Sequence, residues 1–341
     1  MANHQALISE AVTLSLLGIG RTYPNPIVGA LITDGNDKIL SSGFHQGGAH
    51  AEIQALNNLA SIPNGIPNGA SLYITLEPCS HHGKTPPCTD AIIASGIKNV
   101  FYSVVDPNPT AAGGAEKLRA AGIKVEHIDC VSALTSNRDW LTKIKKNRPR
   151  IAWKIAASLD GAVAAEDLTS KWITGSESRN DVKIERSAAD LIVTGTGTVL
   201  ADNPKLLGKD KNPTRLILGY REIPKNYQIF SDDAETIEIK NRDIEEVLSF
   251  SRARGFNRIL IEAGPVLGSA FFKAGLVDEI IFYQAPVILG SSRRFTTGID
   301  LNTIGEKLQL FPYKIERLKN DIKQILMVES AINKELMCLQ G

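Results

Sequence analysis

Cysteine is scarce in this sequence: four residues in a chain of 341 are too few for the disulfide framework of a small secreted protein. The charges nearly cancel, to a formal net charge of +1, and aromatic residues make up only 6% of the chain. These values argue against broad electrostatic capture of nucleic acid or of an anionic membrane. No apolar run reaches membrane-spanning length, and the first residues lack the basic start of a signal peptide. We therefore predict a cytoplasmic protein with no nucleic-acid or membrane partner.

The chain is too long for most single hydrophobic cores, and a short basic run lies near its middle. Its length predicts two domains, residues 1–145 and residues 146–341. The basic run, Lys143–Arg150, permits two interpretations. One is a patch for phosphate or nucleic acid. The other, favoured by the nearly neutral total charge, is a solvated connector between the domains.

Three candidate metal ligands lie in the first half of the chain: His50, Cys79 and Cys88. Three protein ligands leave the fourth position of a tetrahedral zinc open for water, which is the catalytic pattern. Zinc activates that water, and Glu52 stands where a carboxylate can carry a proton to the leaving group. His-x-Glu followed by Pro-Cys and a second Cys is the signature of zinc nucleobase deaminases. Eight residues separate the cysteines instead of the usual two, so we expect them to loop out and Cys88 to begin a helix.

The same residues allow two other interpretations. A structural zinc site would take a fourth protein ligand, for which His81 and His82 are candidates. Alternatively, the two cysteines are inert core residues. Glu52 favours a catalytic site with one zinc per chain, because a structural site has no use for a carboxylate beside the metal. The remaining cysteines, Cys130 and Cys338, are expected to be free thiols, as in a reducing compartment.

Hydrophobic periodicity predicts an α/β protein in both halves. In the first half we expect strands at 27–33, 38–43, 71–76, 99–105 and 124–128, and helices at 4–18, from 50, at 89–95 and at 114–121. In the second half we expect strands at 151–157, 191–194, 215–219, 236–239, 258–261, 279–284 and 322–328, and helices at 179–188, 243–254 and 265–274. Cys79 then follows a strand, at the edge where sites in such sheets lie. His50 and Glu52 can face one metal only if the first helical turn is irregular.

The string Pro-Cys-Ser-His-His-Gly-Lys-Thr-Pro-Pro-Cys, at residues 78–88, resembles the deaminase half of the bifunctional deaminase/reductase family of riboflavin biosynthesis. The resemblance implies a cytidine-deaminase-like three-layer α/β/α domain. It also implies substrate contacts at Asn25, His45, Lys84, Thr85, Asp106 and Asn108. The alternative for the Asn-Pro and Asp-Pro pairs is an ordinary turn. After Pro109 the chain departs from the family, because Thr110–Gly114 replaces a hydrophobic residue and spaced glycines.

In the second half, two glycine-containing turns follow predicted strands, where backbone N–H groups can meet phosphate. Neither turn carries the Gly-x-Gly-x-x-Gly fingerprint, so an ordinary dinucleotide-binding fold is not expected. Four segments of this half carry a second resemblance: Lys154–Gly161, Ser170–Thr174, Thr198–Pro204 and Glu262–Pro265. They resemble the reductase half of the same family, a dihydrofolate-reductase-like α/β domain. The resemblance implies NADPH contacts at Ala156, Trp172, Thr198, Asp202, Gly264, Pro265, Val266, Leu267, Gly268, Ser269 and Ala270. It implies substrate contacts at Lys154, Ser170, Arg186, Leu206, Lys209 and Glu262. Lys209 stands near a family arginine and keeps its charge without the bidentate fork.

Together the two halves predict an enzyme with two activities. Zinc-activated water removes the exocyclic amine of 2,5-diamino-6-(5-phosphoribosylamino)pyrimidin-4-one, and NADPH then reduces the ribosyl side chain to ribityl. Lys154 is a candidate to polarise or protonate the sugar. We expect a homo-oligomer that acts on a small molecule. The alternatives are a nucleic-acid-editing zinc deaminase with an appended binding domain, which would need a basic, aromatic face, and a non-catalytic protein stabilised by zinc.

Overall fold

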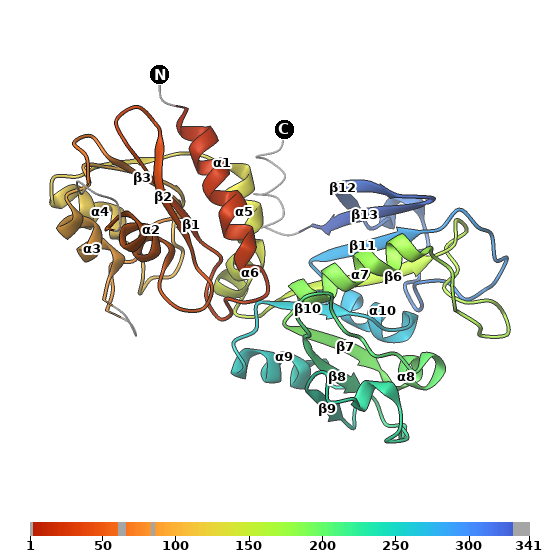
Figure 1. The fold of residues 1–341 in the computed structure, drawn as a ribbon. Helices are drawn as coiled ribbons and strands as arrows, with labels where there is room; N and C mark the ends of the chain where they lie inside the picture. The colour runs from red at the N-terminus through yellow and green to blue at the C-terminus, as the bar shows by residue number, and fades with distance from the viewer. Residues whose placement is uncertain (1–2, 61–65, 83–85, 330–341) are drawn as a thin grey trace. The chain divides into compact units, whose positions relative to one another are not determined.

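A computed structural model describes residues 3–60, 66–82 and 86–329. The chain forms two compact units, of which the first ends at Lys146 and the second begins at Asn147. In Figure 1 the first unit runs from red to yellow and the second from yellow-green to blue. Within the described ranges, no helix is both long and apolar enough to cross a membrane.

The first unit is built on a five-stranded mixed sheet in the order β2-β1-β3-β4-β5. The strands are β1 (Gly29–Thr33), β2 (Ile39–Phe44), β3 (Ser71–Leu76), β4 (Asn99–Val104) and β5 (Lys124–His127). Strand β1 is antiparallel to both β2 and β3, whereas β3, β4 and β5 run parallel. Strands β1 and β3 are buried along their whole length, which explains their largely apolar sequences.

Helices cover both faces of this sheet and complete three layers (Figure 1). One face carries α1 (His4–Ser15), followed by the 3-10 turn Leu16–Gly18, together with α5 (Val131–Ser136) and α6 (Arg138–Lys146). The other carries α2 (Ala51–Ala60), α3 (Cys88–Ser95) and α4 (Gly114–Ala120). Helix α2 lies very close to β2, because a Cβ at Gly43 would stand 2.4 Å from the carbonyl oxygen of Ala51. This close approach fixes the start of α2 beside the sheet.

The second unit contains an eight-stranded sheet in the order β12-β13-β11-β6-β10-β7-β8-β9. Its strands are β6 (Arg150–Ala157), β7 (Leu191–Gly195), β8 (Thr214–Leu218), β9 (Thr236–Ile239), β10 (Arg258–Ile261), β11 (Glu279–Gln284), β12 (Leu310–Leu318) and β13 (Asp321–Val328). The six strands from β11 to β9 in this order are parallel, and β12 and β13 extend the sheet antiparallel.

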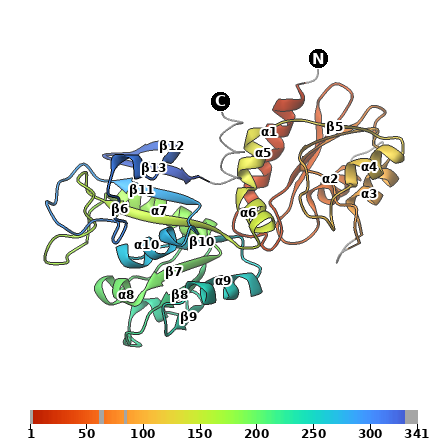
Figure 2. The same ribbon diagram turned by 180° about the vertical axis from the view of Figure 1, so that it is seen from behind.

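Two hydrophobic cores lie on the two faces of the second sheet. One core includes Val182 of α7 (Ser176–Ala188) and Val199 of α8 (Thr196–Asp202). The other includes Val247 of α9 (Ile244–Ala253) and Phe271 of α10 (Pro265–Lys273). Short 3-10 turns lie at Gln228–Phe230 and Ile304–Glu306. Figure 2 shows the same helices from behind.

The basic run near residue 146 corrects one prediction. Its first residues end helix α6, and Arg150 begins β6 with a fully buried side chain. Arg148 Nη1 lies 2.6 Å from Asp278, and Arg150 Nη2 lies 3.2 Å from Glu279. The prediction of a solvated connector is therefore wrong for both arginines, because carboxylates far along the chain pair with them inside the second unit.

Most predicted strands are confirmed, and those at 71–76, 236–239, 258–261 and 279–284 have the expected bounds. Four elements were missed: α5, α6, α8 and β12. The segment after β7, expected to be a glycine turn, enters helix α8 directly. The strand expected at 322–328 to finish the sheet is β13, but β12 lies beyond it and forms the edge of the sheet.

Candidate functional site

His50, Cys79 and Cys88 converge in the first unit from three separate segments. His50 immediately precedes α2, Cys79 lies beyond the carboxyl end of β3, and Cys88 is the first residue of α3. His50 Nδ1 lies 3.2 Å from Cys88 Sγ and 3.7 Å from Cys79 Sγ. Bonds of about 2.0 Å to nitrogen and 2.3 Å to sulfur at a tetrahedral metal place the two ligand atoms roughly 3.6 Å apart. The three donors therefore fit one zinc ion.

The side chains of Cys79 and Cys88 share a hydrogen bond. That bond is the main cause that lowers the pKa of the Cys79 thiol, and together with burial it raises the pKa of the Cys88 thiol. Cys79 Sγ also accepts a hydrogen bond from the Cys88 backbone N–H at 3.3 Å. The thiolate is the form that ligates metals, so this environment favours the required charge state at Cys79, whereas at Cys88 a bound cation would have to favour it.

Glu52 lies in the first turn of α2, beside these ligands. Its side chain is only 3% exposed, and burial raises the pKa of its carboxyl to about 7. A bound cation would act in the opposite direction by favouring the carboxylate. His50 immediately precedes α2, and its carbonyl oxygen accepts the ordinary helical hydrogen bond from Gln54 N at 3.0 Å, so the irregular first turn stays a prediction.

Asn25 and His45 lie next to the metal ligands. Asn25 Nδ2 is 3.3 Å from His45 Nε2, and the His45 and His50 rings meet edge-on with centroids 5.5 Å apart. The other ring nitrogen of His45 lies 3.2 Å from the carbonyl oxygen of Ala49. Burial lowers the pKa of His45, so neutral imidazole is favoured. A neutral ring that donates to Ala49 can accept a hydrogen bond from the Asn25 amide.

Asn137 supports the loop that carries Asn25, a role that was not predicted from the sequence. Its buried side chain accepts a hydrogen bond from Ile27 N at 3.0 Å and donates one to Ile27 O at 2.8 Å. The two residues are 110 positions apart. A side chain that pairs with a distant backbone has no local sequence signal.

Asp106 and Asn108 form a turn at the carboxyl end of β4. Asp106 Oδ1 accepts from Asn108 N at 2.8 Å, and Asn108 Oδ1 accepts from Thr110 N at 3.2 Å. Burial raises the pKa of Asp106 to about 6. The turn interpretation is confirmed, and substrate binding by these residues stays a prediction. The other two predicted contacts of this region, Lys84 and Thr85, lie outside the described residues.

His81 and His82 do not join the metal ligands in the described part of the chain. His82 Nε2 instead lies 4.0 Å from Asp90, on an exposed surface. A structural site with a fourth histidine ligand is therefore not supported.

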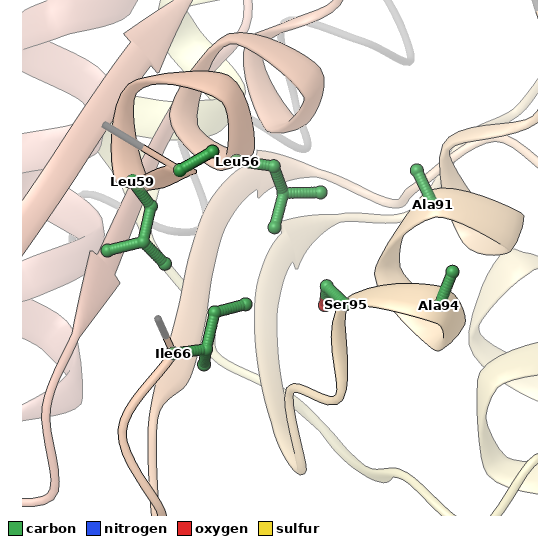
Figure 3. A pocket seen from close by; sticks show the side chains of 7 residues that line it. Leu56, Leu59, Ile66, Ala91, Ala94 and Ser95 are labelled. Atoms are coloured by element: carbon green, nitrogen blue, oxygen red, sulfur yellow. The ribbon is translucent and has the colours of Figure 1, made fainter. Parts of the chain in front are cut away.

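An apolar hollow of about 400 Å³ lies between α2 and α3 (Figure 3). Its lining carries no titratable side chain and consists of Leu56, Leu59, Ala60, Ile66, Ala91, Ala94 and Ser95. This hollow offers no group for acid–base or metal chemistry.

In the second unit, Lys154 of β6 and Arg186 of α7 meet Glu262, which directly follows the carboxyl end of β10. Arg186 donates to both Glu262 oxygens, at 2.6 and 2.9 Å, and Lys154 Nζ lies 3.1 Å from Glu262. Burial opposes ionisation of Glu262, but Arg186 and Lys154 outweigh it and lower its pKa to about 2. The sequence predicted the three residues separately, and the structure brings them together as one buried charge cluster.

The predicted cofactor segments also meet. Thr198 Oγ1 accepts a hydrogen bond from Gly264 N at 3.0 Å, which joins the first turn of α8 to the residue that caps α10. Ser170 Oγ donates to Asp202 at 2.8 Å. Trp172 is 69% exposed, and the Arg179 guanidinium lies 4.5 Å from its ring. Arg179 was missed because its cation–π partner is identifiable only in three dimensions.

The remaining predicted contacts of the second unit differ in exposure, and several of them are buried. Leu206 is 3% exposed and packs in the core shared with α7 and α8. Within α10, Gly268 and Ser269 are buried, while Val266 is 67% exposed. Lys209 is exposed, and its N–H donates to Ser187 Oγ at 2.8 Å. Ala156, in β6, is half-buried. A cofactor that lies against the exposed face of α10 would therefore contact only some of the residues predicted from Gly264 to Ala270.

Comparisons with known proteins match both units. Residues 1–104 match the cytidine and deoxycytidylate deaminase zinc-binding region, and residues 149–324 match the RibD C-terminal domain. The riboflavin biosynthesis protein RibD of Mycobacterium tuberculosis is 37% identical over 314 residues, covering 89% of this chain and 91% of that protein. The chain belongs to the RibD family.

Other RibD proteins support this assignment. The Escherichia coli protein is 35% identical over 84% of this chain and 89% of its own length. A solved deaminase/reductase from Thermotoga maritima is 31% identical, covers 96% of this chain and 99% of its own, and superimposes with a TM-score of 0.88. Acinetobacter baumannii RibD gives 33% identity and a TM-score of 0.86, with 96% of this chain and 99% of that chain covered.

RibD membership confirms the main predictions from sequence. The chain is a bifunctional deaminase and reductase of riboflavin biosynthesis. It joins a cytidine-deaminase-like zinc-binding domain to a dihydrofolate-reductase-like domain that uses NADPH.

Proposed function

We propose that the first unit deaminates 2,5-diamino-6-(5-phosphoribosylamino)pyrimidin-4-one and that the second reduces the ribosyl side chain of the product. The Thermotoga maritima relative is described as diaminohydroxyphosphoribosylaminopyrimidine deaminase and 5-amino-6-(5-phosphoribosylamino)uracil reductase. The observation that carries the first activity is the convergence of His50, Cys79 and Cys88 beside the buried carboxyl of Glu52. The buried cluster around Glu262 supports the second.

In the deaminase unit, His50, Cys79 and Cys88 would hold zinc, which when bound would supply the Lewis acidity that activates water at neutral pH. Glu52 is placed to accept a proton from water and to deliver it to the departing amine. The Asn25 amide, oriented by neutral His45, reads the pyrimidine edge. Asp106 and Asn108 complete the proposed contacts to the substrate.

In the reductase unit, Glu262 acts as a fixed negative charge. It pairs with the Lys154 ammonium, which in this proposal lies beside the sugar and polarises the reacting oxygen or donates a proton to it. Arg186 donates three N–H groups, two of them to Glu262 and one to the carbonyl oxygen of Leu207. A guanidinium has five, so two remain for substrate phosphate. NADPH, when bound against Trp172, Thr198, Asp202 and α10, supplies the hydride.

We also infer that the two units are the two catalytic domains predicted at residues 1–145 and 146–341, and we infer a cytoplasmic location and a homo-oligomeric state. The location rests on the low cysteine content, which fits a reducing compartment. The substrate is a small molecule in this proposal.

Separate assays of the two steps test the proposal. Zinc-loaded protein supplied with the diaminopyrimidinone should release ammonia without NADPH. The deaminated product should then support oxidation of NADPH, which is measured by the fall in NADPH absorbance. Protein with one zinc per chain that releases no ammonia from this substrate would contradict the proposed deaminase activity.

A further inference from the structure

Two side chains that flank the metal ligand Cys79 reach out to the same loop. They are Glu77 and Ser80, and the loop runs from Asp106 to Ala115. It joins β4 to α4 and contains the proposed substrate contacts Asp106 and Asn108. The segment Glu77–Ser80, which carries Cys79, and this loop are therefore joined by hydrogen bonds.

Glu77 ties the two ends of the loop together. Its carboxylate is 5% exposed and accepts from Asp106 N at 3.2 Å through one oxygen and from Ala115 N at 3.0 Å through the other. Its own N–H donates to Val104 O at 2.8 Å, which extends the β3–β4 pairing. Hydrogen bonds to a buried charged acceptor are among the stronger ones in proteins.

Ser80 fixes the middle of the loop from the other side of Cys79. Its hydroxyl lies 2.7 Å from Ala112 O and 3.3 Å from Ala111 O, and its N–H donates to Ala111 O at 3.2 Å. The chains also touch directly, since a Cβ at Gly114 would stand 1.7 Å from the Pro78 carbonyl oxygen. No side chain fits at that position.

All these bonds reach backbone atoms of the loop. The attachment of the loop therefore depends on carbonyl and N–H groups and on the absence of a side chain at Gly114, rather than on particular loop side chains. The position of Asp106 relative to Cys79 is therefore set by Glu77 and Ser80, which lie outside the loop.

We propose that Glu77 and Ser80 are positioning residues for deamination, which hold the Asp106–Asn108 turn against the Cys79 segment and so set substrate affinity. This inference rests on the proposed assignment of zinc to Cys79 and of substrate to Asp106 and Asn108. Glu77 and Ser80 act through the loop and touch neither metal nor reacting atoms. Misplacing a binding group by about 1 Å can cost up to a hundredfold in efficiency.

The test compares Glu77→Gln, Ser80→Ala and Ser80→Thr in the full zinc-loaded chain. Glu77→Gln places an amide N–H2 against a backbone donor, so the KM of ammonia release should rise by about tenfold. Ser80→Ala should raise it severalfold, and Ser80→Thr, which keeps the hydroxyl, should restore it. Zinc content should stay at one per chain and kcat should stay within about threefold of wild type. The matched control is Glu116→Gln, on an exposed face of α4, which should leave KM unchanged.

Unchanged KM in Glu77→Gln and Ser80→Ala, with active wild type, would overturn the inference alone. Loss of zinc would do so too, because the two residues would then support the metal ligand rather than the loop. A fall in kcat at constant KM would assign Glu77 to the chemistry. If Glu77→Gln does not fold, the KM values of Ser80→Ala and Ser80→Thr test the inference. Wild type that releases no ammonia would instead contradict the proposed function.

Discussion

Glu52 and Glu262 are two buried glutamates, one in each unit, with opposite electrostatic settings. Their side chains are 3% and 5% exposed. Burial raises the pKa of Glu52 to about 7, whereas Arg186 and Lys154 overcome burial and lower that of Glu262 to about 2. The difference teaches that neighbours, rather than burial, decide the role of a carboxyl. Glu52 is suited to moving a proton, and Glu262 to holding a constant negative charge.

The largest expected effect follows from removing a metal ligand. Cys88→Ala leaves two of the three donors, so zinc should be lost and ammonia release abolished. Metal analysis and an ammonia assay measure both. The control is Cys130→Ala, because Cys130 is buried in the same unit but outside the ligand cluster. Full zinc retention in Cys88→Ala would contradict the site.

Glu52→Gln should lower the rate of deamination by about a hundred- to ten-thousand-fold, the usual range for a lost proton carrier. Zinc content should not change, because Glu52 is not among the three ligands. The check is kcat for ammonia release in protein of measured zinc content. Deamination at the wild-type rate would show that another group carries the proton.

Glu262→Gln should destabilise the second unit, because it leaves Arg186 and Lys154 without their buried counter-charge. Breaking such a cluster typically costs about 3–5 kcal/mol. Hydrogen exchange of backbone amides in β6 and β10 measures the local loss of stability. Glu235→Gln, which removes an exposed ion pair with Arg254, is the control and should change exchange little. Equal exchange in both variants would contradict the role given to the cluster.

The smallest effect concerns acid stability. The pKa of Glu262 is about 2 in the folded protein, below its ordinary value of 4.5. A depressed folded pKa adds stability that is complete above pH 4.5 and is lost as the pH falls toward 2. Between pH 5 and pH 3, amides near Glu262 should therefore lose protection more steeply in wild type than in Glu262→Gln. Parallel pH profiles would argue that the carboxyl is not held ionised by its neighbours.

The metal site was predictable because its residue types carry their chemistry in the sequence. His50, Glu52, Cys79 and Cys88 have a recognisable order, and the structure brings the three ligand atoms within 4.8 Å of one another. The prediction that Cys88 begins a helix is confirmed by α3. Fully buried parallel strands were equally clear, because they are short apolar runs bounded by turn residues.

The missed features depend on partners far along the chain. Arg148 and Arg150 belong to a charged run, and only the positions of Asp278 and Glu279 explain their burial. Helix α8 begins with Thr-Gly-Thr, residues of low helix propensity that are typical of a turn. Strand β12 lies at the sheet edge with most of its residues half-buried or exposed, so it lacks a clear alternation.

The backbone-directed side chains form a third group. Asn137, Glu77 and Ser80 bind backbone carbonyl and N–H groups, which nearly all residue types possess, so no pair of residue types identifies them. The cluster of Lys154, Arg186 and Glu262 was predicted as three substrate contacts. That these residues bind one another first, and what this does to the pKa of Glu262, required the structure.

The most direct test of two separate glutamate roles measures both activities in both variants. Glu52→Gln should lose deamination but oxidise NADPH with deaminated substrate at close to the wild-type rate. Glu262→Gln should release ammonia normally but lose reductase activity. If either substitution abolishes both activities while zinc and folding persist, the two sites are not independent, and the division of chemistry between the two units is wrong.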